Sequence, residues 1–410
     1  MCQALDAEAI MQNTFCLVAL YMKYQNSNDI VLLYNDPFFK DEYFYCISDP
    51  IALAGASDWW RRCSATFWSQ EFWLPAGLTW DDIHTSLYDI LFIPLLVGLF
   101  FVLLRHCVVE PFLLLPIARK AQIPNKRPRP PEPNKTLQVV FQRYETSPPK
   151  KVLAEASRAT RLTERQVERW LRRSFAMNRL NRHDKFLDCG FKLVCHVWFG
   201  IMGAAVTLSK PWFWDTTLCW KGYPDHPVTT DVYWYYMILL GYYWAITYSE
   251  LPRPGGKGSD KAQMILHHSL TILLIVFSWT TGYVRIGSLI LFVHEYSDIA
   301  LLAAKVCHYS GNDAPTEPLF VAFLVLWGVT RCGILPFWIV RSVFTEATPA
   351  GVQMPALYMM QSWFVGLLCL TAIWTGLIVR TVSKKLRGEG LKDARSATED
   401  SESDKAEKKD

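Results

Sequence analysis

No CxxC pair occurs in this 410-residue chain, and the spacing of its eleven cysteines matches no metal site. The N-terminus lacks the basic start of a cleaved signal peptide, because the moderately apolar run at residues 8–22 is broken by Gln12 and Asn13. A large excess of one charge is also missing, since the formal net charge is only +4. The cysteines that lie within apolar runs are therefore expected to be buried as small hydrophobic residues.

Long apolar runs are abundant instead. Hydrophobic residues make up 51% of the chain, and runs such as DILFIPLLVGLFFVLL from Asp89 are almost free of polar groups. A helix of about twenty apolar residues crosses roughly 30 Å of lipid. Only helices and closed barrels satisfy their backbone there, and these runs are too long and too uniform for barrel strands. The sequence therefore predicts an all-α polytopic membrane protein.

Seven membrane spans are expected, and the basic residues between them set their orientation. The spans lie at about 88–110, 187–208, 231–249, 264–282, 286–306, 318–341 and 357–380. The segment between the first two spans holds about eighteen Lys and Arg against about six acidic residues, which places it in the cytosol. The expected domains are a luminal extension (1–86), a first membrane helix (87–118), a basic cytosolic segment (119–185), a six-helix domain (186–382) and a disordered cytosolic tail (383–410).

The basic cytosolic segment has a helical pattern of its own. Two short helices are expected after the Ser-Pro-Pro sequence at 147–149. Thr163 and Gln166 have the spacing of a capping box that opens the second helix. Val167 and Leu171 then fall on one apolar face of that helix. A small helical insert is therefore expected between the first two spans.

Ionisable residues gather in the fourth and fifth spans, where they are costly and usually mark a functional site. On the fourth span, a polar stripe at helical spacing begins at His267 and ends at Ser278. On the fifth span, His294 and Glu295 each share a helix face with Asp298. Two polar stripes in lipid are expected to face each other or a common cavity.

The depth of these groups in the membrane brings His268 near Asp298. They lie about 6 Å and about 12 Å from the cytosolic ends of two antiparallel spans. A histidine beside a carboxylate can act as a general base. One alternative is a polar cluster that only holds the helices together. Another is a zinc site, although adjacent histidines such as His267 and His268 point about 100° apart and do not easily ligate one ion.

The complete pattern resembles the Lag1 motif of the ceramide synthases, within their TLC domain. Similar landmarks occur in the same order outside the motif, from FWLPAGLTWDDI before the first span to LPFW near the end, so that the resemblance covers about residues 57–385. The residues that match the motif are His267, His268, Thr271, Leu274, Ser278, Trp279, Arg285, Gly287, His294, Glu295, Ser297, Asp298 and Lys305.

The basic segment resembles the truncated homeobox-like domain of many animal ceramide synthases. LTERQVERWLRRSF is similar to a recognition helix, but Arg173 stands where a homeodomain carries its adenine-reading Asn. DNA is therefore not the expected partner. Other departures from the family are Glu295 in place of Asp, Leu239 and Leu302 in place of glutamates, Gly77 in place of a glycosylated Asn, an altered loop at 252–258 and an unmatched extension at 1–56.

The resemblance implies transfer of a fatty acyl group from acyl-CoA to the amine of a sphingoid base in the endoplasmic reticulum membrane. It further implies a barrel of the last six helices, acyl-CoA as co-substrate with no bound cofactor or metal, and homodimers or heterodimers with related synthases. The competing hypothesis is a non-catalytic lipid-binding or lipid-sensing protein of TLC type. The residues expected to be catalytic are His267, His268, Glu295 and Asp298, and the expected supporting residues are Ser278, Arg285, His294 and Lys305.

Overall fold

The computed structural model describes residue 63 and residues 65–67, 69–125, 130–177, 180–250 and 258–387. The chain forms two units, one of residues 1–83 with 351–359 and the other of residues 84–350 with 360–410. The expectations for the extension at 1–56, for the loop at 252–257 and for the tail after residue 387 fall outside the described residues.

The described residues between 69 and 83 of the first unit form two short helices held by aromatic and polar contacts. They are α5 (Gln70–Trp73) and the 3-10 helix η1 (Trp80–Asp82). The rings of Phe67 and Trp73 pack edge to face with centroids 5.1 Å apart. The carboxylate of Asp82 accepts a hydrogen bond of 2.7 Å from the backbone N–H of Thr79, which caps η1.

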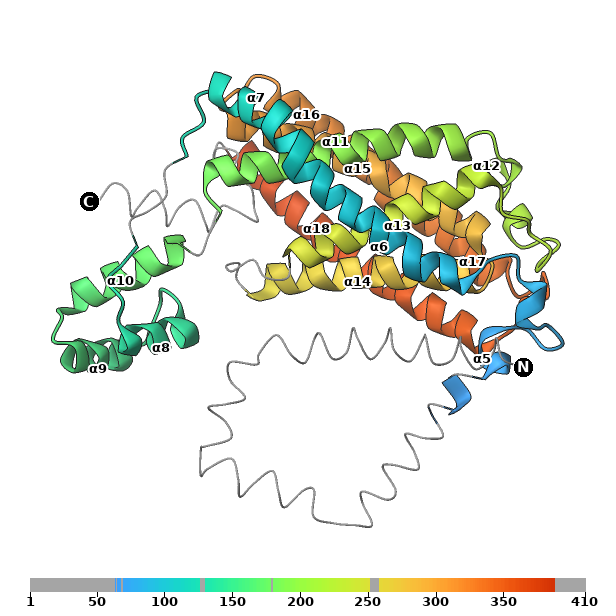
Figure 1. Ribbon diagram of the computed structural model, residues 1–410, viewed down its shortest axis with the longest axis horizontal. Helices are drawn as coiled ribbons and strands as arrows, with labels where there is room; N and C mark the ends of the chain where they lie inside the picture. The colour runs from blue at the N-terminus through green and yellow to red at the C-terminus, as the bar shows by residue number, and fades with distance from the viewer. Residues whose placement is uncertain are drawn as a thin grey trace, which may run out of the picture. The chain divides into compact units, whose positions relative to one another are not determined.

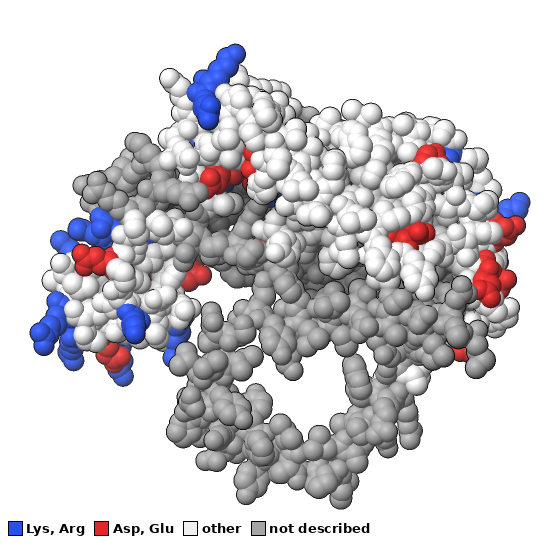
Figure 2. All heavy atoms as spheres, in the orientation of Figure 1, with Lys and Arg blue, Asp and Glu red and all other residues white. Residues whose placement is uncertain are grey.

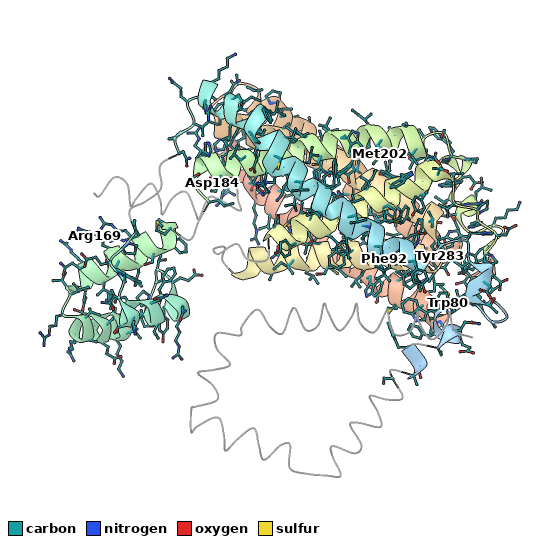
Figure 3. The ribbon with its side chains drawn as sticks, viewed as in Figure 1. Trp80, Phe92, Arg169, Asp184, Met202 and Tyr283 are labelled. Atoms are coloured by element: carbon teal, nitrogen blue, oxygen red, sulfur yellow. The ribbon has the colours of Figure 1, made fainter. Side chains whose placement is uncertain are left out.

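The first membrane helix of the second unit is continuous from Leu87 to Lys120. It consists of α6 (Leu87–Leu103), the π-helical segment η2 (Leu104–Leu114) and α7 (Leu115–Lys120). Ser86 starts it, because its side chain accepts a hydrogen bond from the backbone of Tyr88. Phe92, labelled on α6 in Figure 3, is 62% exposed, as expected of a side chain that faces lipid.

Six further long helical elements follow and form a bundle with α6 (Figure 1). Six helices of the described part of the chain are long and apolar enough to cross a membrane, and α13 is not among them. Its six tyrosines and two tryptophans lower its mean hydropathy. The six elements are α11 (Arg182–Thr207), α13 (Thr230–Glu250), α14 (Gly258–Thr280), α15 (Val284–Ser310), the continuous α16 (Thr316–Trp327), η4 (Gly328–Val340) and α17 (Arg341–Thr345), and α18 (Pro355–Leu386).

Helix α13 lies where the seventh span was expected and packs against α6, α11, α14 and α15, but it does not have the composition of a membrane-crossing helix. Its contact with α6 depends on small residues. A Cβ atom on Gly98 would lie 3.1 Å from the carbonyl oxygen of Gly241. Small residues at such a crossing let two backbones approach closely. A loop with α12 (Pro211–Trp214) and η3 (Thr216–Cys219) connects α11 to α13.

The basic insert between the first two expected spans contains three helices where the sequence pattern indicated two. They are α8 (Lys135–Tyr144), α9 (Lys150–Thr160) and α10 (Glu164–Met177). The capping box is confirmed, since Gln166 accepts from the backbone of Thr163 at 2.8 Å and its own N–H donates to the Thr163 hydroxyl at 3.3 Å. Helix α8 was missed because its apolar positions are mixed with polar ones, although Asn134 caps its start by accepting from Leu137.

The insert has its own small core and a charged outer surface. Val167 and Leu171 are fully buried in this core, as their spacing predicted. Arg169 lies on the exposed face of α10 (Figure 3), and Figure 2 shows Lys and Arg gathered over these helices. The surface of the membrane helices in the same view is almost uncharged, which agrees with a bilayer environment.

Candidate active site

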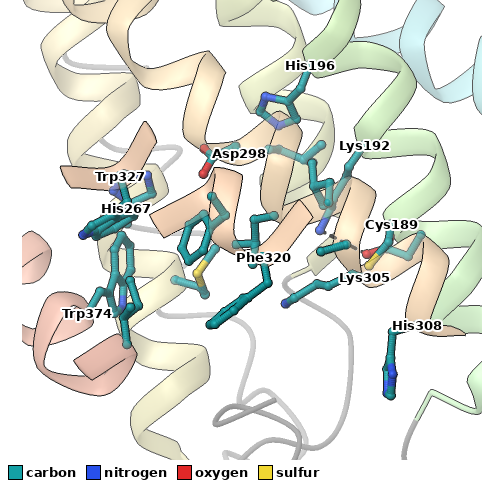
Figure 4. A pocket seen from close by; sticks show the side chains of 18 of the residues that line it. Cys189, Lys192, His196, His267, Asp298, Lys305, His308, Phe320, Trp327 and Trp374 are labelled. Carbon is teal, nitrogen blue, oxygen red and sulfur yellow. Dashed lines mark ion pairs between the residues drawn. The ribbon is translucent and has the colours of Figure 1, made fainter. Parts of the chain in front are cut away.

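A cavity of about 340 Å³ lies among the six membrane elements that follow the insert. Side chains from α11, α13, α14, α15, α16, η4 and α18 form its wall, so that the six helical elements after the insert line a common space. Figure 4 shows part of this wall. Four of the eight predicted site residues line the cavity, namely His267, His268, Asp298 and Lys305.

His268 faces a carboxylate that the sequence pattern did not identify. Its Nδ1 atom lies 3.6 Å from an Oε atom of Glu250, the last residue of α13. The two side chains are 6% and 16% exposed. The separation is that of a close ion pair rather than a hydrogen bond, and catalytic contacts are often this long before substrate binds. With Nδ1 directed at the carboxylate, Nε2 is the atom left for chemistry.

A row of alternating charges extends from Glu250 to the first membrane helix. Lys192 of α11 lies between two carboxylates, 2.5 Å from Glu250 and 3.1 Å from Asp188. Arg105 of η2 then lies 3.2 Å from Asp188 and 2.7 Å from Glu110. Charges buried in a bundle are stable only when such partners compensate each other. The row therefore fixes the carboxylate of Glu250 beside His268.

His267 has a different environment because it is adjacent to His268 on the helix. Its ring packs edge to face against the indole of Trp374, with centroids 5.0 Å apart. The two imidazole centroids are 5.8 Å apart. Both rings line the cavity, so that two buried imidazoles face the same space from one turn of α14.

Asp298 lines the cavity and pairs with Arg331 of η4. The distance between the carboxylate and the guanidinium is 3.0 Å, and Arg331 is only 3% exposed. The same guanidinium donates to the carbonyl of His294 at 2.8 Å and to the hydroxyl of Ser297 at 3.2 Å. This planar fork holds three acceptors of α15 at once. The carboxylate partner expected for His268 is thus engaged by an arginine.

Glu295 does not line the cavity directly. It is 1% exposed, and its carboxylate lies 2.6 Å from Nδ1 of His196 on α11. His196 does line the cavity. Glu295, which stands in place of the Asp that is usual in the family, is therefore connected to the cavity through His196, a histidine outside the motif.

The remaining predicted residues lie elsewhere. Ser278 and His294 line a separate space of about 20 Å³. The ring Nδ1 of His294 donates to the carbonyl of Ile290 at 2.7 Å. Arg285 borders neither cavity, because it donates to the carbonyl of Leu218 at 2.7 Å and stacks over Trp212 at 5.1 Å. Among the described residues, no group of three or more His, Cys, Asp or Glu is arranged to hold a metal ion.

The fold and the cavity define a polytopic helical membrane protein of TLC type. Residues 185–380 match the TLC domain family TRAM_LAG1_CLN8. This range includes α11, the element that carries His196 and Lys192, and continues into α18.

Similarity to known proteins extends over most of the chain. Human ceramide synthase 5 is 32% identical over 344 residues, which cover 82% of this chain and 86% of that protein. Mouse ceramide synthase 3 is 32% identical over 279 residues, 67% of this chain and 72% of that protein. Ceramide synthase hyl-1 of Caenorhabditis elegans is 28% identical and covers 82% and 84%. This chain belongs to the ceramide synthase family.

Proposed function

We propose that this protein is an enzyme that transfers a fatty acyl group from acyl-CoA to the amine of a sphingoid base. The observation that carries the proposal is the pair formed by His268 and Glu250 at a cavity inside the membrane helices. A protein that only bound lipid would not need to bury ionised groups beside an imidazole, and burying them is costly. The similarity to ceramide synthases supports the same chemistry.

The reaction needs a base and a stabilised oxyanion. An amine is protonated at neutral pH and cannot attack a thioester until it loses a proton. His268 supplies an imidazole held by Glu250, and His267 supplies a second one. Attack by the amine and transfer through an acyl-imidazole are two routes to the same amide. A cation at Lys305 suits the anionic phosphates of CoA.

The same proposal extends to the surroundings of the enzyme. The endoplasmic reticulum membrane is proposed from the family resemblance. A luminal N-terminus and a cytosolic C-terminus are proposed from the basic segment between the first two spans. Acyl-CoA and the sphingoid base are the substrates, and membrane lipids surround the spans. Dimers with itself or with related synthases are proposed from the family resemblance.

Acylation by membranes that contain the protein tests this function. The chain is expressed in cells without their own ceramide synthase activity, and membranes receive sphinganine with a panel of acyl-CoAs. Dihydroceramide is then measured by mass spectrometry for the wild type, His268→Ala and His267→Ala, with His84→Ala as the control. His84 pairs with Asp225 outside the cavity and is 46% exposed. Loss of product in both site variants, with normal product in the control, is the expected result.

A wild-type protein that reaches the membrane but forms no product with any acyl-CoA would contradict the proposal. Product formed at equal rates by His268→Ala would contradict the assignment of the residue. Varying the acyl-CoA in the same assay measures the chain length that the enzyme accepts.

A further inference from the structure

The cavity has a second histidine–carboxylate pair, formed by His196 and Glu295. The two side chains are 9% and 1% exposed, and Nδ1 of His196 donates to the carboxylate at 2.6 Å. Two aromatic rings hold the imidazole edge-on, Tyr242 at 5.6 Å and Phe199 at 6.2 Å between centroids. Because Nδ1 carries the proton, the neutral ring has its lone pair on Nε2. His196 is thus a fixed imidazole on the cavity wall.

Amide formation from an ammonium ion requires two proton transfers. The nitrogen of the substrate enters with three protons and leaves with one. One of the two lost protons ends on the sulfur of CoA, and the other must reach water. Two of the imidazoles on the cavity wall are each paired with a carboxylate, His268 with Glu250 and His196 with Glu295, so the two protons can pass through separate pairs.

We propose that His196 is a further catalytic residue, the base that takes the first proton from the ammonium of the sphingoid base. This assignment rests on the proposed function. The ammonium gives its proton to Nε2 of His196, and the freed lone pair forms the C–N bond at the thioester carbonyl. The C–S bond breaks with its electrons on sulfur, and the second proton passes from nitrogen to that thiolate through His268. His196 then releases its proton to water.

The surroundings of His196 favour a transient positive charge on its ring. Asp298 lines the same cavity and lies within electrostatic range of His196, and in Figure 4 the imidazole projects from α11 on the side of this carboxylate. A positive charge on the ring is therefore compensated by two acidic residues of α15, Glu295 and Asp298. The titratable groups that face His196 are Glu295 and Asp298 of α15, Tyr242 of α13, His268 of α14, and Lys192 of its own helix.

The variant His196→Asn tests the proposal, because the Asn amide can replace Nδ1–H as the donor to Glu295 but has no counterpart of Nε2. At about pH 7, we expect kcat to fall about 100-fold, the usual size of a lost general base. As the pH rises, the ratio of wild-type kcat to variant kcat should fall about tenfold per pH unit. The variant can use only sphingoid base that is already deprotonated, and the deprotonated fraction of an amine with a pKa of about 10 rises about tenfold per pH unit. A purely structural role would give a deficit that does not change with pH.

Two further variants keep the test decisive. His183→Asn is the matched control, since His183 is also a buried histidine of α11 but does not line the cavity, and it should retain wild-type activity. If His196→Asn does not accumulate, Glu295→Gln gives the same test. Its kcat is expected to be about tenfold below that of the wild type at about pH 7, and this difference in kcat should become smaller as the pH rises. Wild-type rates in His196→Asn, or a pH-independent deficit, would overturn the proposal. A wild type without product would instead show that the proposed function itself is wrong.

Discussion

The carboxylate of Glu250 and Nδ1 of His268 lie 3.6 Å apart, although the two residues belong to different helices of the cavity wall. Lys192 contacts the same carboxylate at 2.5 Å, so the glutamate is held from two sides. A carboxylate placed in this way orients an imidazole and stabilises the imidazolium that forms during proton transfer. The activity is therefore expected to depend on a residue outside the recognised motif.

Replacing Glu250 with Gln removes the charge and keeps the shape. We expect the rate of acyl transfer to fall about 100-fold, because His268 loses its counterion and the proton on its ring is no longer fixed. The measurement is dihydroceramide formation at equal protein level. Glu317→Gln is the control, since Glu317 pairs with Lys385 at 2.9 Å on an exposed surface where an ion pair contributes little. Equal loss in both variants would mean that the effect is not specific to the pair.

Shortening Glu295 to Asp restores the residue that is usual in the family, yet it should lower activity here. The carboxylate would withdraw by about 1 Å or more from Nδ1 of His196, which it now meets at 2.6 Å. Misplacement on this scale can cost about 100-fold in rate. An assay of Glu295→Asp beside the wild type checks this expectation, and an increase in activity would show that His196 does not depend on the longer side chain.

Arg331 holds Asp298, Ser297 and the carbonyl of His294 together, so a lysine should not replace it. An ammonium keeps the charge but cannot reach three acceptors in a plane. We expect Arg331→Lys to lower the free energy of unfolding by about 1–3 kcal/mol, because a buried acceptor is left without its donor. Thermal unfolding of the protein in detergent measures this, with the exposed Arg341→Lys as the control. Equal unfolding midpoints for the two variants would argue against this role.

The sequence predicted much of the fold but only part of the site. His267, His268 and Asp298 were found because they stand out as ionisable groups in apolar runs at helical spacing, and Lys305 was found from the family resemblance. Their partners were missed because they come from other helices, and helical spacing relates only residues of one helix. The same signal was nevertheless present in three overlooked residues, each ionisable and placed within an apolar stretch, namely Lys192, His196 and Arg331.

The identity of the pairs could not be predicted from the motif alone. Asp298 was expected beside His268, since the count of residues predicted that both would lie in the cytosolic half of the membrane. Depth along the membrane normal does not determine which faces of the helices meet. In the structure, Arg331 of η4 forms an ion pair with Asp298, and Glu250 at the end of α13 lies beside His268. Only the packing of helices that are distant in sequence decides between such pairings.

Gly287 lies within the motif at a point where the helices pack closely, and replacing it tests this packing. An added Cβ would overlap the hydroxyl of Tyr236, which donates to the carbonyl of Val284 at 3.0 Å and cannot easily withdraw. Gly287→Ala is therefore expected to lower the free energy of unfolding by about 1–3 kcal/mol. Gly376→Ala is the matched control, because no atom lies within 4 Å of its added Cβ and alanine favours a helix. Thermal unfolding should separate the two variants, and equal midpoints would contradict the packing argument.

The loop before α13 should make stability depend on pH. Burial lowers the pKa of His226 below its ordinary value of about 6.5, although its ring donates to the carbonyl of Lys221 at 3.0 Å. Because the unfolded state then binds a proton more readily than the folded state, stability is retained above about pH 6.5 and is lost as the pH falls below it. Thermal unfolding of the wild type and of His226→Asn at about pH 7.5 and about pH 5.5 measures this difference. The variant should lose less stability on acidification than the wild type, and an equal loss would show that His226 is not responsible.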